Sequence, residues 1–183
     1  MILHLVRHGP THARGMVGWT DLPADLSDTA ALARLAAHLP DVPVVSSDLS
    51  RAMATADAIQ GSRPRLPHDA DLREIHFGDW EMQRFDQIDP VLSRRFWEGQ
   101  GDIAPPGGES WNTMSARVSS VIDRLAGHTN EAIVVAHFGA ILSQLQRALG
   151  LTAQQVFAHK IDNLSVTEVH LHENNAPLIN HNP

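Results

Sequence analysis

Short runs of apolar residues alternate along this chain with segments of helical periodicity. The apolar runs at residues 1–6, 42–45 and 132–136 each stop at a polar turn, which is typical of buried strands. Strands that alternate with helices predict an α/β domain with a largely parallel sheet. A later alternating run, residues 164–171, predicts one more strand at or near an edge of that sheet.

The segments between these runs carry recognisable helix ends, such as Ser or Asp at the start and Gly at the stop. The expected helices cover residues 28–39 with Ser27 as N-cap, about 49–60 before Gly61, 110–125 with a start at Ser110, and 139–149 before Gly150. Residues 62–110 contain five prolines and short helical pieces, and we expect them to lie over the body of the domain. The polar tail, residues 174–183, is expected to cross the surface.

Length and composition indicate a single globular domain and argue against a disordered or disulfide-rich chain. At roughly 150 residues per domain, a chain of 183 residues predicts a single domain over residues 1–183 with one core. An apolar fraction of 43% and a charged fraction of 19% argue against a disordered chain. The absence of cysteine excludes a disulfide scaffold, a thiolate metal site and a cysteine nucleophile, and it fits the reducing cytoplasm, where we expect the protein to act.

The charge balance and the hydropathy argue against two classes of partner, nucleic acids and membranes. Fourteen basic and 21 acidic residues give a net charge of −7, which argues against nucleic acid as a partner because phosphate binding needs a basic face. Any anionic substrate must therefore be held by a local cluster of cations. No apolar run approaches the ~18 residues of a membrane span, so no membrane partner is expected. The apolar run at the N-terminus is also too short for a signal peptide.

Cationic and imidazole residues follow the three apolar runs. Arg7 and His8 follow the first run, Arg51 lies shortly after the second, and His137 follows the third. Ligands of parallel sheets bind outside the carboxyl ends of the strands, so we expect these four side chains to share one pocket. Each alone has an ordinary explanation, as a solvated turn or a core histidine, but their coincidence predicts a dianion such as a phosphoryl group, which arginine's fork fits.

Five blocks of the sequence, in order, resemble those of the histidine phosphatase superfamily, also called the phosphoglycerate mutase-like family. The blocks are LVRHGPT at 5–11, SSDLSRA at 46–52, LREIHFGDWE at 72–81, PGGES at 106–110 and VVAHFG at 134–139. They span most of the chain. The resemblance implies a three-layer α/β/α sandwich with a mostly parallel central sheet, the phosphoglycerate mutase-like fold.

The resemblance also implies a mechanism. His8 would attack phosphorus and form a phosphohistidine, which divides one difficult displacement into two easier ones. Arg7, Arg51 and His137 would bind the phosphoryl oxygens and stabilise the transition state. No cofactor and no metal are expected, because arginines supply the charge that magnesium supplies elsewhere.

Glu74 resembles the family's general acid and base, which protonates the leaving alcohol and then activates water. Glu81, in the same block, is the alternative acid. An ordinary explanation of Glu74 is a surface carboxylate that pairs with Arg73. For the catalytic role, burial and bound phosphate should raise the pKa of Glu74.

The chain departs from the family pattern at four positions near these blocks, one of which, Met82 in place of a glycine after Glu81, has no explanation from the sequence. Pro10 replaces a glutamate, Arg14 replaces an asparagine three residues after Thr11, and Phe138 replaces a glycine. We expect Arg14 to take over a phosphate contact from the asparagine, and Phe138 to form a wall near the ligand. The expected substrate-binding residues are Arg7, Thr11, Arg14, Arg51, His137 and Phe138.

The short chain leaves little room for the segments that close the site of the family's mutases, which favours hydrolysis of small phosphomonoesters. Residues 15–23 and 106–110 look most like the alpha-ribazole and broad-specificity phosphatase branches. A mutase-type phosphoryl transferase and a non-catalytic phosphate-ester-binding module stay as alternatives. So does a metal site on the histidine-rich end, at His170, His172 and His181. Monomer and homodimer are both open, and residues 99–110 form either a mobile flap or an ordinary loop.

Overall fold

A five-stranded sheet forms the centre of the computed structural model, which describes residues 1–171 and the backbone of residues 179–181. Its order is β2-β3-β1-β4-β5. The strands are β1 (Ile2–Arg7), β2 (Val44–Ser46), β3 (Glu131–Ala136), β4 (Val166–His170) and β5 (Ile179–His181). β1 and β2 each pair with β3 in parallel, and only β4 runs against the other described strands. The predicted, mostly parallel sheet is confirmed.

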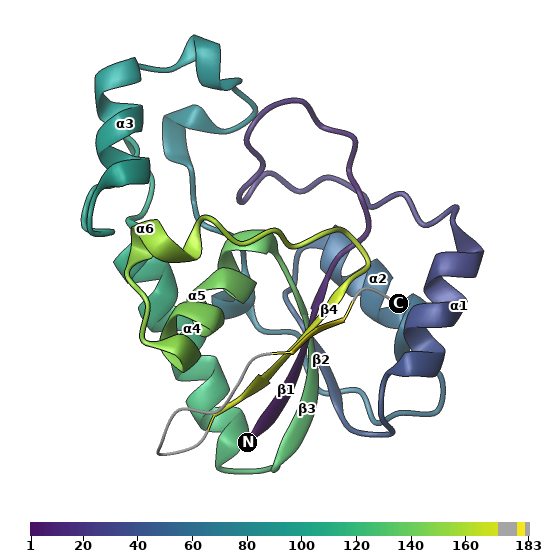
Figure 1. Ribbon diagram of the computed structural model, residues 1–183. Coiled ribbons are helices and arrows are strands. Elements are labelled where there is room, and N and C mark those ends of the chain that lie inside the picture. Colours follow the sequence, from purple (N-terminus) through teal and green to yellow (C-terminus); the bar gives the residue numbers. More distant parts are fainter. Residues whose placement is uncertain (172–178, 182–183) are drawn as a thin grey trace.

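Helices cover both faces of the sheet, as Figure 1 shows. The α-helices are α1 (Thr29–His38), α2 (Ser50–Gln60), α3 (Pro90–Glu98), α4 (Trp111–Ala126), α5 (Phe138–Leu149) and α6 (Ala153–Val156). Short 3-10 turns lie at η1 (Ala70–Leu72), η2 (Gly78–Trp80) and η3 (Phe85–Gln87). α1 and α2 lie on one side of the sheet and α4, α5 and α6 on the other, which confirms the three-layer sandwich (Figure 1). α3 and the loop after β1 stand beyond the carboxyl ends of the parallel strands.

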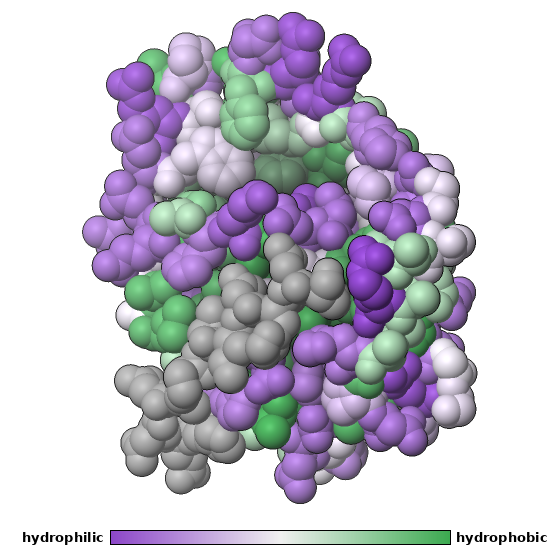
Figure 2. All heavy atoms as spheres, turned by 45° about the vertical axis from the view of Figure 1, so that its right-hand side comes forward, coloured by the Kyte–Doolittle hydropathy of each residue, from purple (hydrophilic) through white to green (hydrophobic). Residues whose placement is uncertain are grey.

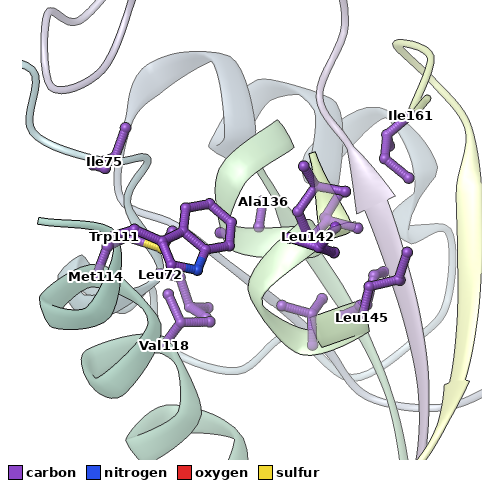
Figure 3. Close-up of a cluster of buried hydrophobic side chains, with 14 of the residues drawn as sticks. Leu72, Ile75, Trp111, Met114, Val118, Ala136, Leu142, Leu145 and Ile161 are labelled. Carbon is purple, nitrogen blue, oxygen red and sulfur yellow. The ribbon is translucent and has the colours of Figure 1, made fainter. Parts of the chain in front are cut away.

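The side-chain alternation of the strands divides the core in two. Leu3 and Leu5 of β1 pack with the α4 and α5 side, whereas Val6 packs with α1 and α2. Figure 3 shows the indole of Trp111 between α4 and α5, near Met114. Its Nε1 atom donates to Gln146 Oε1 at 2.6 Å, so the one polar atom of this buried ring is satisfied. On the face in Figure 2, apolar surface is broken into small patches between hydrophilic residues.

The helix ends agree with the sequence except at one cap. Ser110 caps α4 as predicted, and Gly61 and Gly150 end α2 and α5 with positive φ values of 57° and 63°. The prediction of Ser27 as N-cap of α1 is wrong, because Asp28 Oδ1 accepts the hydrogen bond from Ala31 N at 2.9 Å. Both residue types cap helices well, so their order in the sequence could not decide between them.

The late strand lies next to an edge, as predicted, but it is not the edge itself. β5 covers the outer side of β4, and it falls in the tail that the sequence analysis treated as polar surface. Three residues are too few to show strand periodicity. At the opposite edge, Val44 of β2 forms an isolated bridge with Arg65, and Ser47, directly after β2, forms one with Asp69. Residues 172–178 and 182–183 lie outside the described part of the chain.

Residues 62–110 lie over the body of the domain as expected, with α3 their main helix. The end of this segment is tied down, since Asp79 N donates to Pro106 O at 2.8 Å and Glu109 N donates to His76 O at 2.9 Å. Whether residues 99–110 move as a flap stays a prediction. Among the residues that the structure describes, no helix is both long and apolar enough to cross a bilayer.

The cap assignment predicts a difference between two neighbouring substitutions. Asp28→Ala should lower the free energy of unfolding by about 1 kcal/mol, because Ala31 N loses its acceptor. Ser27→Ala should cost clearly less. Urea denaturation followed by circular dichroism measures both, and a larger loss for Ser27→Ala would show that the cap is misassigned.

Candidate active site

The carboxyl ends of three parallel strands meet at one place. Arg7 at the end of β1 stands opposite Ala136 at the end of β3, and Ser46 of β2 stands opposite Val135. The pairing continues one residue further, where His8 N donates to Ala136 O at 3.2 Å. This register brings the segments that carry Arg7, His8, Arg51 and His137 to the same end of the sheet, as the sequence predicts.

His8 is buried and is oriented by two hydrogen bonds. Its Nδ1 atom donates to the backbone carbonyl of Gly9 at 2.7 Å, and Nε2 accepts from Arg51 Nε at 3.3 Å. These contacts leave the lone pair on Nε2. Burial, assisted by the charges of Arg51 and Arg7 and opposed by the Gly9 contact, lowers the pKa of His8 to about 3. The ring is therefore neutral and nucleophilic near pH 7.

The two arginines are held by backbone carbonyls. Arg51 donates through Nη1 to Thr20 O at 2.9 Å and through Nη2 to Gly18 O at 2.6 Å. Arg7 donates through Nη1 to Ile161 O at 2.5 Å, and its guanidinium lies 5.3 Å from the ring centre of Phe138. Carbonyls fix a guanidinium without neutralising it, so both cations keep their full charge for a ligand.

Several buried polar atoms near these side chains have no partner. Arg7 Nε and both ring nitrogens of His137 are buried and make no hydrogen bond. The ring centres of His8 and His137 are 5.0 Å apart, and burial lowers the pKa of His137 well below its usual value. Buried polar atoms in proteins nearly always have partners, so this cluster is built to receive a ligand with several polar atoms.

The Glu74 side chain is buried against the first turn of α5. Its carboxylate accepts hydrogen bonds from Gly139 N, at 2.9 Å to Oε2, and from Ile75 N, at 2.9 Å to Oε1. Burial raises the pKa of Glu74, while these bonds and the charges of Arg51 and Arg7 oppose that rise. A Cβ atom at Gly139 would come within 2.3 Å of Glu74 Oε1, so any side chain there would displace the carboxylate.

The alternative explanations of the two glutamates fail. Arg73 binds Asp48, with Nε to Oδ1 at 2.7 Å, so it is not the surface partner of Glu74. Glu81 does not fit the role of alternative acid, because its carboxylate already accepts hydrogen bonds from three residues of the 18–20 loop and from Phe77. Burial would raise the pKa of Glu81, but these bonds outweigh burial and hold it below its usual value.

The remaining predicted binding residues differ in placement. Phe138 begins α5 and lies against Arg7, as a wall should. Thr11 is half-buried and Arg14 is exposed, and no described contact joins Arg14 to the cluster. The loop near Arg14 is instead tied to another segment, since Met16 N donates to Gln83 O at 2.9 Å. Phosphate binding by Thr11 and Arg14 stays a prediction.

The sequence analysis did not identify the turn before β4, which binds the backbone carbonyls at the end of β1. Asn163 Nδ2 donates to His8 O at 2.7 Å, and Leu164 N donates to Arg7 O at 3.0 Å. Leu164 adopts a left-handed conformation with φ 56°. An asparagine in a polar turn before the late strand was the available signal. The sequence analysis also did not identify Arg117, whose Nη2 atom donates to the backbone carbonyl of Glu74 at 2.8 Å.

The histidine-rich end gives no support to a metal site within the described residues, where no group of three or more His, Asp or Glu side chains is arranged to hold a metal ion. His170 instead binds Glu168 Oε1 at 2.6 Å. His172 and the side chain of His181 lie outside the described part of the structure.

A family comparison agrees with this geometry. Residues 3–182 match the model of the histidine phosphatase superfamily, branch 1. The chain belongs to this superfamily. The match includes all five sequence blocks, and with it the strand ends that carry His8 and His137.

Proteins with named activities are similar to this chain over most of its length. A glucosyl-3-phosphoglycerate phosphatase of Mycolicibacterium vanbaalenii is 33% identical over 81% of this chain and 74% of its own length. An adenosylcobalamin/alpha-ribazole phosphatase of Escherichia coli is 30% identical over 88% of this chain and 86% of its own. The structure of a phosphoglycerate mutase from Thermus thermophilus has 33% identity and a TM-score of 0.78, with 98% of each chain covered.

The environment of His8 predicts an unusual titration. Between pH 7 and pH 5 the ring should stay neutral with its proton on Nδ1, because its pKa of about 3 lies far below the usual 6.5. Long-range ¹⁵N NMR of the rings, assigned with His8→Ala, measures the protonation state of His8. Protonation of His8 near pH 6.5 would contradict the inferred environment.

Proposed function

We propose that this protein hydrolyses small phosphomonoesters through a phosphohistidine on His8. The observation that carries the proposal is the arrangement of a neutral His8 Nε2 lone pair beside buried donors without partners at Arg7 and His137. A phosphoryl group supplies both an electrophile for the lone pair and acceptor oxygens for the donors. The superfamily match supports this chemistry.

In the first step, Nε2 of His8 attacks phosphorus in line with the ester bond. The N–P bond forms as the P–O bond to the alcohol breaks, and protonated Glu74 gives its proton to the leaving oxygen. The imidazole becomes cationic, and the Nδ1 contact to Gly9 O at 2.7 Å stabilises that charge. The products are phosphohistidine, the free alcohol and the Glu74 carboxylate.

In the second step, the Glu74 carboxylate takes a proton from water, whose oxygen attacks phosphorus. The N–P bond breaks and its electron pair returns to Nε2, so His8 and protonated Glu74 are restored together with inorganic phosphate. Burial is what makes Glu74 suitable, because it raises the pKa of the carboxyl and allows it to hold the proton from the second step until the next turnover.

The cations serve both steps. Arg7 and Arg51 donate to the oxygens on which negative charge is spread in the transition state, and the carbonyls that hold them prevent reorganisation as the charge moves. In this proposal every charge is supplied by side chains, and no step needs a resident metal.

Phosphatase names among the relatives support hydrolysis over mutase chemistry, and small phosphate esters as the substrate class. The family match over residues 3–182 supports a single catalytic domain. We also propose the cytoplasm as the site of action, since a chain with no cysteine needs no oxidising compartment. A non-catalytic phosphate-binding module is the alternative from another class, and phosphoenzyme trapping separates the two.

Trapping tests the proposed nucleophile. Wild-type protein mixed with ³²P-labelled phosphomonoester and quenched in alkali should carry acid-labile phosphate on His8, because the N–P bond hydrolyses in acid. His8→Ala should carry none and should be inactive, whereas His128→Ala, at an exposed position, should match wild type. Phosphate binding without a phosphoenzyme or turnover in wild type would favour the binding module.

Leaving-group dependence tests the proposed acid. Glu74→Gln should lower kcat/KM, which reports the first step, about 10²- to 10⁴-fold for an alkyl phosphate, because an alkoxide then leaves without a proton. The loss should be much smaller for p-nitrophenyl phosphate, whose leaving group is stable as an anion. Glu98→Gln, at an exposed end of α3, serves as control. Equal losses for both substrates would exclude Glu74 as the acid.

A further inference from the structure

We propose that Glu81 is a positioning residue, which sets the orientation and the charge environment of Arg51 through the peptide group between Gly18 and Trp19. The inference rests on the proposed function for its kinetic readout, but its main readout, phosphate binding, does not require turnover. Glu81 lies in the block that contains Glu74, and the proposed mechanism leaves it without a task.

The carboxylate of Glu81 is committed to the backbone. Oε2 accepts from Gly18 N at 3.0 Å, Thr20 N at 3.3 Å and Thr20 Oγ1 at 2.7 Å. Oε1 accepts from Trp19 N at 2.8 Å and Phe77 N at 3.2 Å. Five donors occupy a group with about four lone-pair sites, so this carboxylate has no capacity left for a substrate proton.

One peptide group joins this carboxylate to Arg51. The N–H of Trp19 donates to Glu81 Oε1 at 2.8 Å, and the carbonyl of the same peptide group, Gly18 O, accepts from Arg51 Nη2 at 2.6 Å. Hydrogen bonds in such a chain polarise one another, so the negative charge of Glu81 strengthens the carbonyl as an acceptor for the guanidinium. Thr20 O, at 2.9 Å from Arg51 Nη1, is fixed by the same loop.

Close packing makes the loop rigid at this point. A Cβ atom at Gly18 would come within 2.1 Å of Ile75 O and 2.4 Å of Glu81 Oε1, so the backbone lies directly against the carboxylate. The two fixed carbonyls in turn aim Arg51 Nε at His8 Nε2, 3.3 Å away. A shift of the loop would therefore change the direction of the donor that faces the nucleophile.

The indirect contact has a functional advantage. A carboxylate bound directly to the guanidinium would occupy the fork that phosphate needs. Glu81 and Arg51 form no such ion pair in the described structure. Burial lowers the pKa of Arg51, and the charges of Glu74, Asp21 and Glu81 oppose that shift, so Glu81 is one of the groups that favour the protonated guanidinium. Glu81 thus acts as a counter-charge that does not compete with the ligand.

A double-mutant cycle tests the coupling. We expect Glu81→Gln to weaken binding of inorganic phosphate, measured by calorimetry, and to lower kcat/KM, each by roughly 10- to 100-fold, because a small misplacement of a binding group has effects of that size. In an Arg51→Ala background, the same change should cost less than about 3-fold. Independent, multiplicative losses would overturn the proposal, as would wild-type phosphate affinity in Glu81→Gln.

Two further variants separate positioning from loss of fold. Thr20→Val keeps the carboxylate but removes its shortest hydrogen bond, so it should give an intermediate loss of phosphate affinity with an unchanged melting temperature. Asp89→Asn is the matched control, since Asp89 also accepts from backbone amides, at Val91 and Leu92, but far from Arg51 in the hydrogen-bond network. It should bind phosphate as wild type does. Equal losses of phosphate affinity in Asp89→Asn and Glu81→Gln would show that the effect is general destabilisation and would contradict the positioning role.

The experiment keeps the two proposals apart. If wild type binds phosphate but hydrolyses no phosphomonoester, the proposed function fails while the coupling between Glu81 and Arg51 can still be measured by binding. If wild type hydrolyses esters and Glu81→Gln binds phosphate normally, the function stands and the positioning role is wrong.

Discussion

The parallel register of β1, β3 and β2 is the constraint on which the rest of the structure depends. Arg7 stands opposite Ala136, and Ser46 stands opposite Val135, so the residues that follow each strand emerge at one level. A slip of one residue would turn His8 toward the opposite face of the sheet and separate it from His137. The apolar packing on both faces fixes this register, and in that sense the core determines the geometry of the cationic cluster.

The cluster buries two positively charged guanidinium groups close together, and the fold stabilises them with the dipoles of backbone carbonyls. Arg7 and Arg51 lie beside two buried imidazoles, and burial opposes their charges. Carbonyls of Ile161, Gly18 and Thr20 orient the guanidinium groups. The negative charge of Glu81 stays behind a peptide group, and the Glu74 carboxyl, whose pKa burial raises, is bound to backbone amides at the start of α5. The site is therefore ordered before a ligand arrives, and its strongest attraction is kept for that ligand.

The amino-acid sequence predicts the part of this arrangement that depends on local pattern. Apolar runs that end in Arg7-His8 and His137 give both the sheet and the identity of the cluster. The cap of α1 was mispredicted because two adjacent residues suit the role, and β5 was missed because three residues carry no periodicity. The partners of Glu81 and Asn163 could not be read from the sequence, even though Asn163 stands in a recognisable polar turn, because each side chain binds backbone atoms that are distant in the chain.

The central position of β1 has a consequence for how the protein is made. β1 is synthesised well before its neighbours in the sheet, which are β3, beginning at Glu131, and β4, beginning at Val166. At roughly 5–20 residues per second, an apolar strand waits on the order of ten seconds for its first partner to leave the ribosome. The cluster is complete only when Asn163 and Leu164, in the turn before β4, donate to the backbone carbonyls of His8 and Arg7. The cluster therefore cannot be complete in a nascent chain before the turn that precedes β4 has emerged.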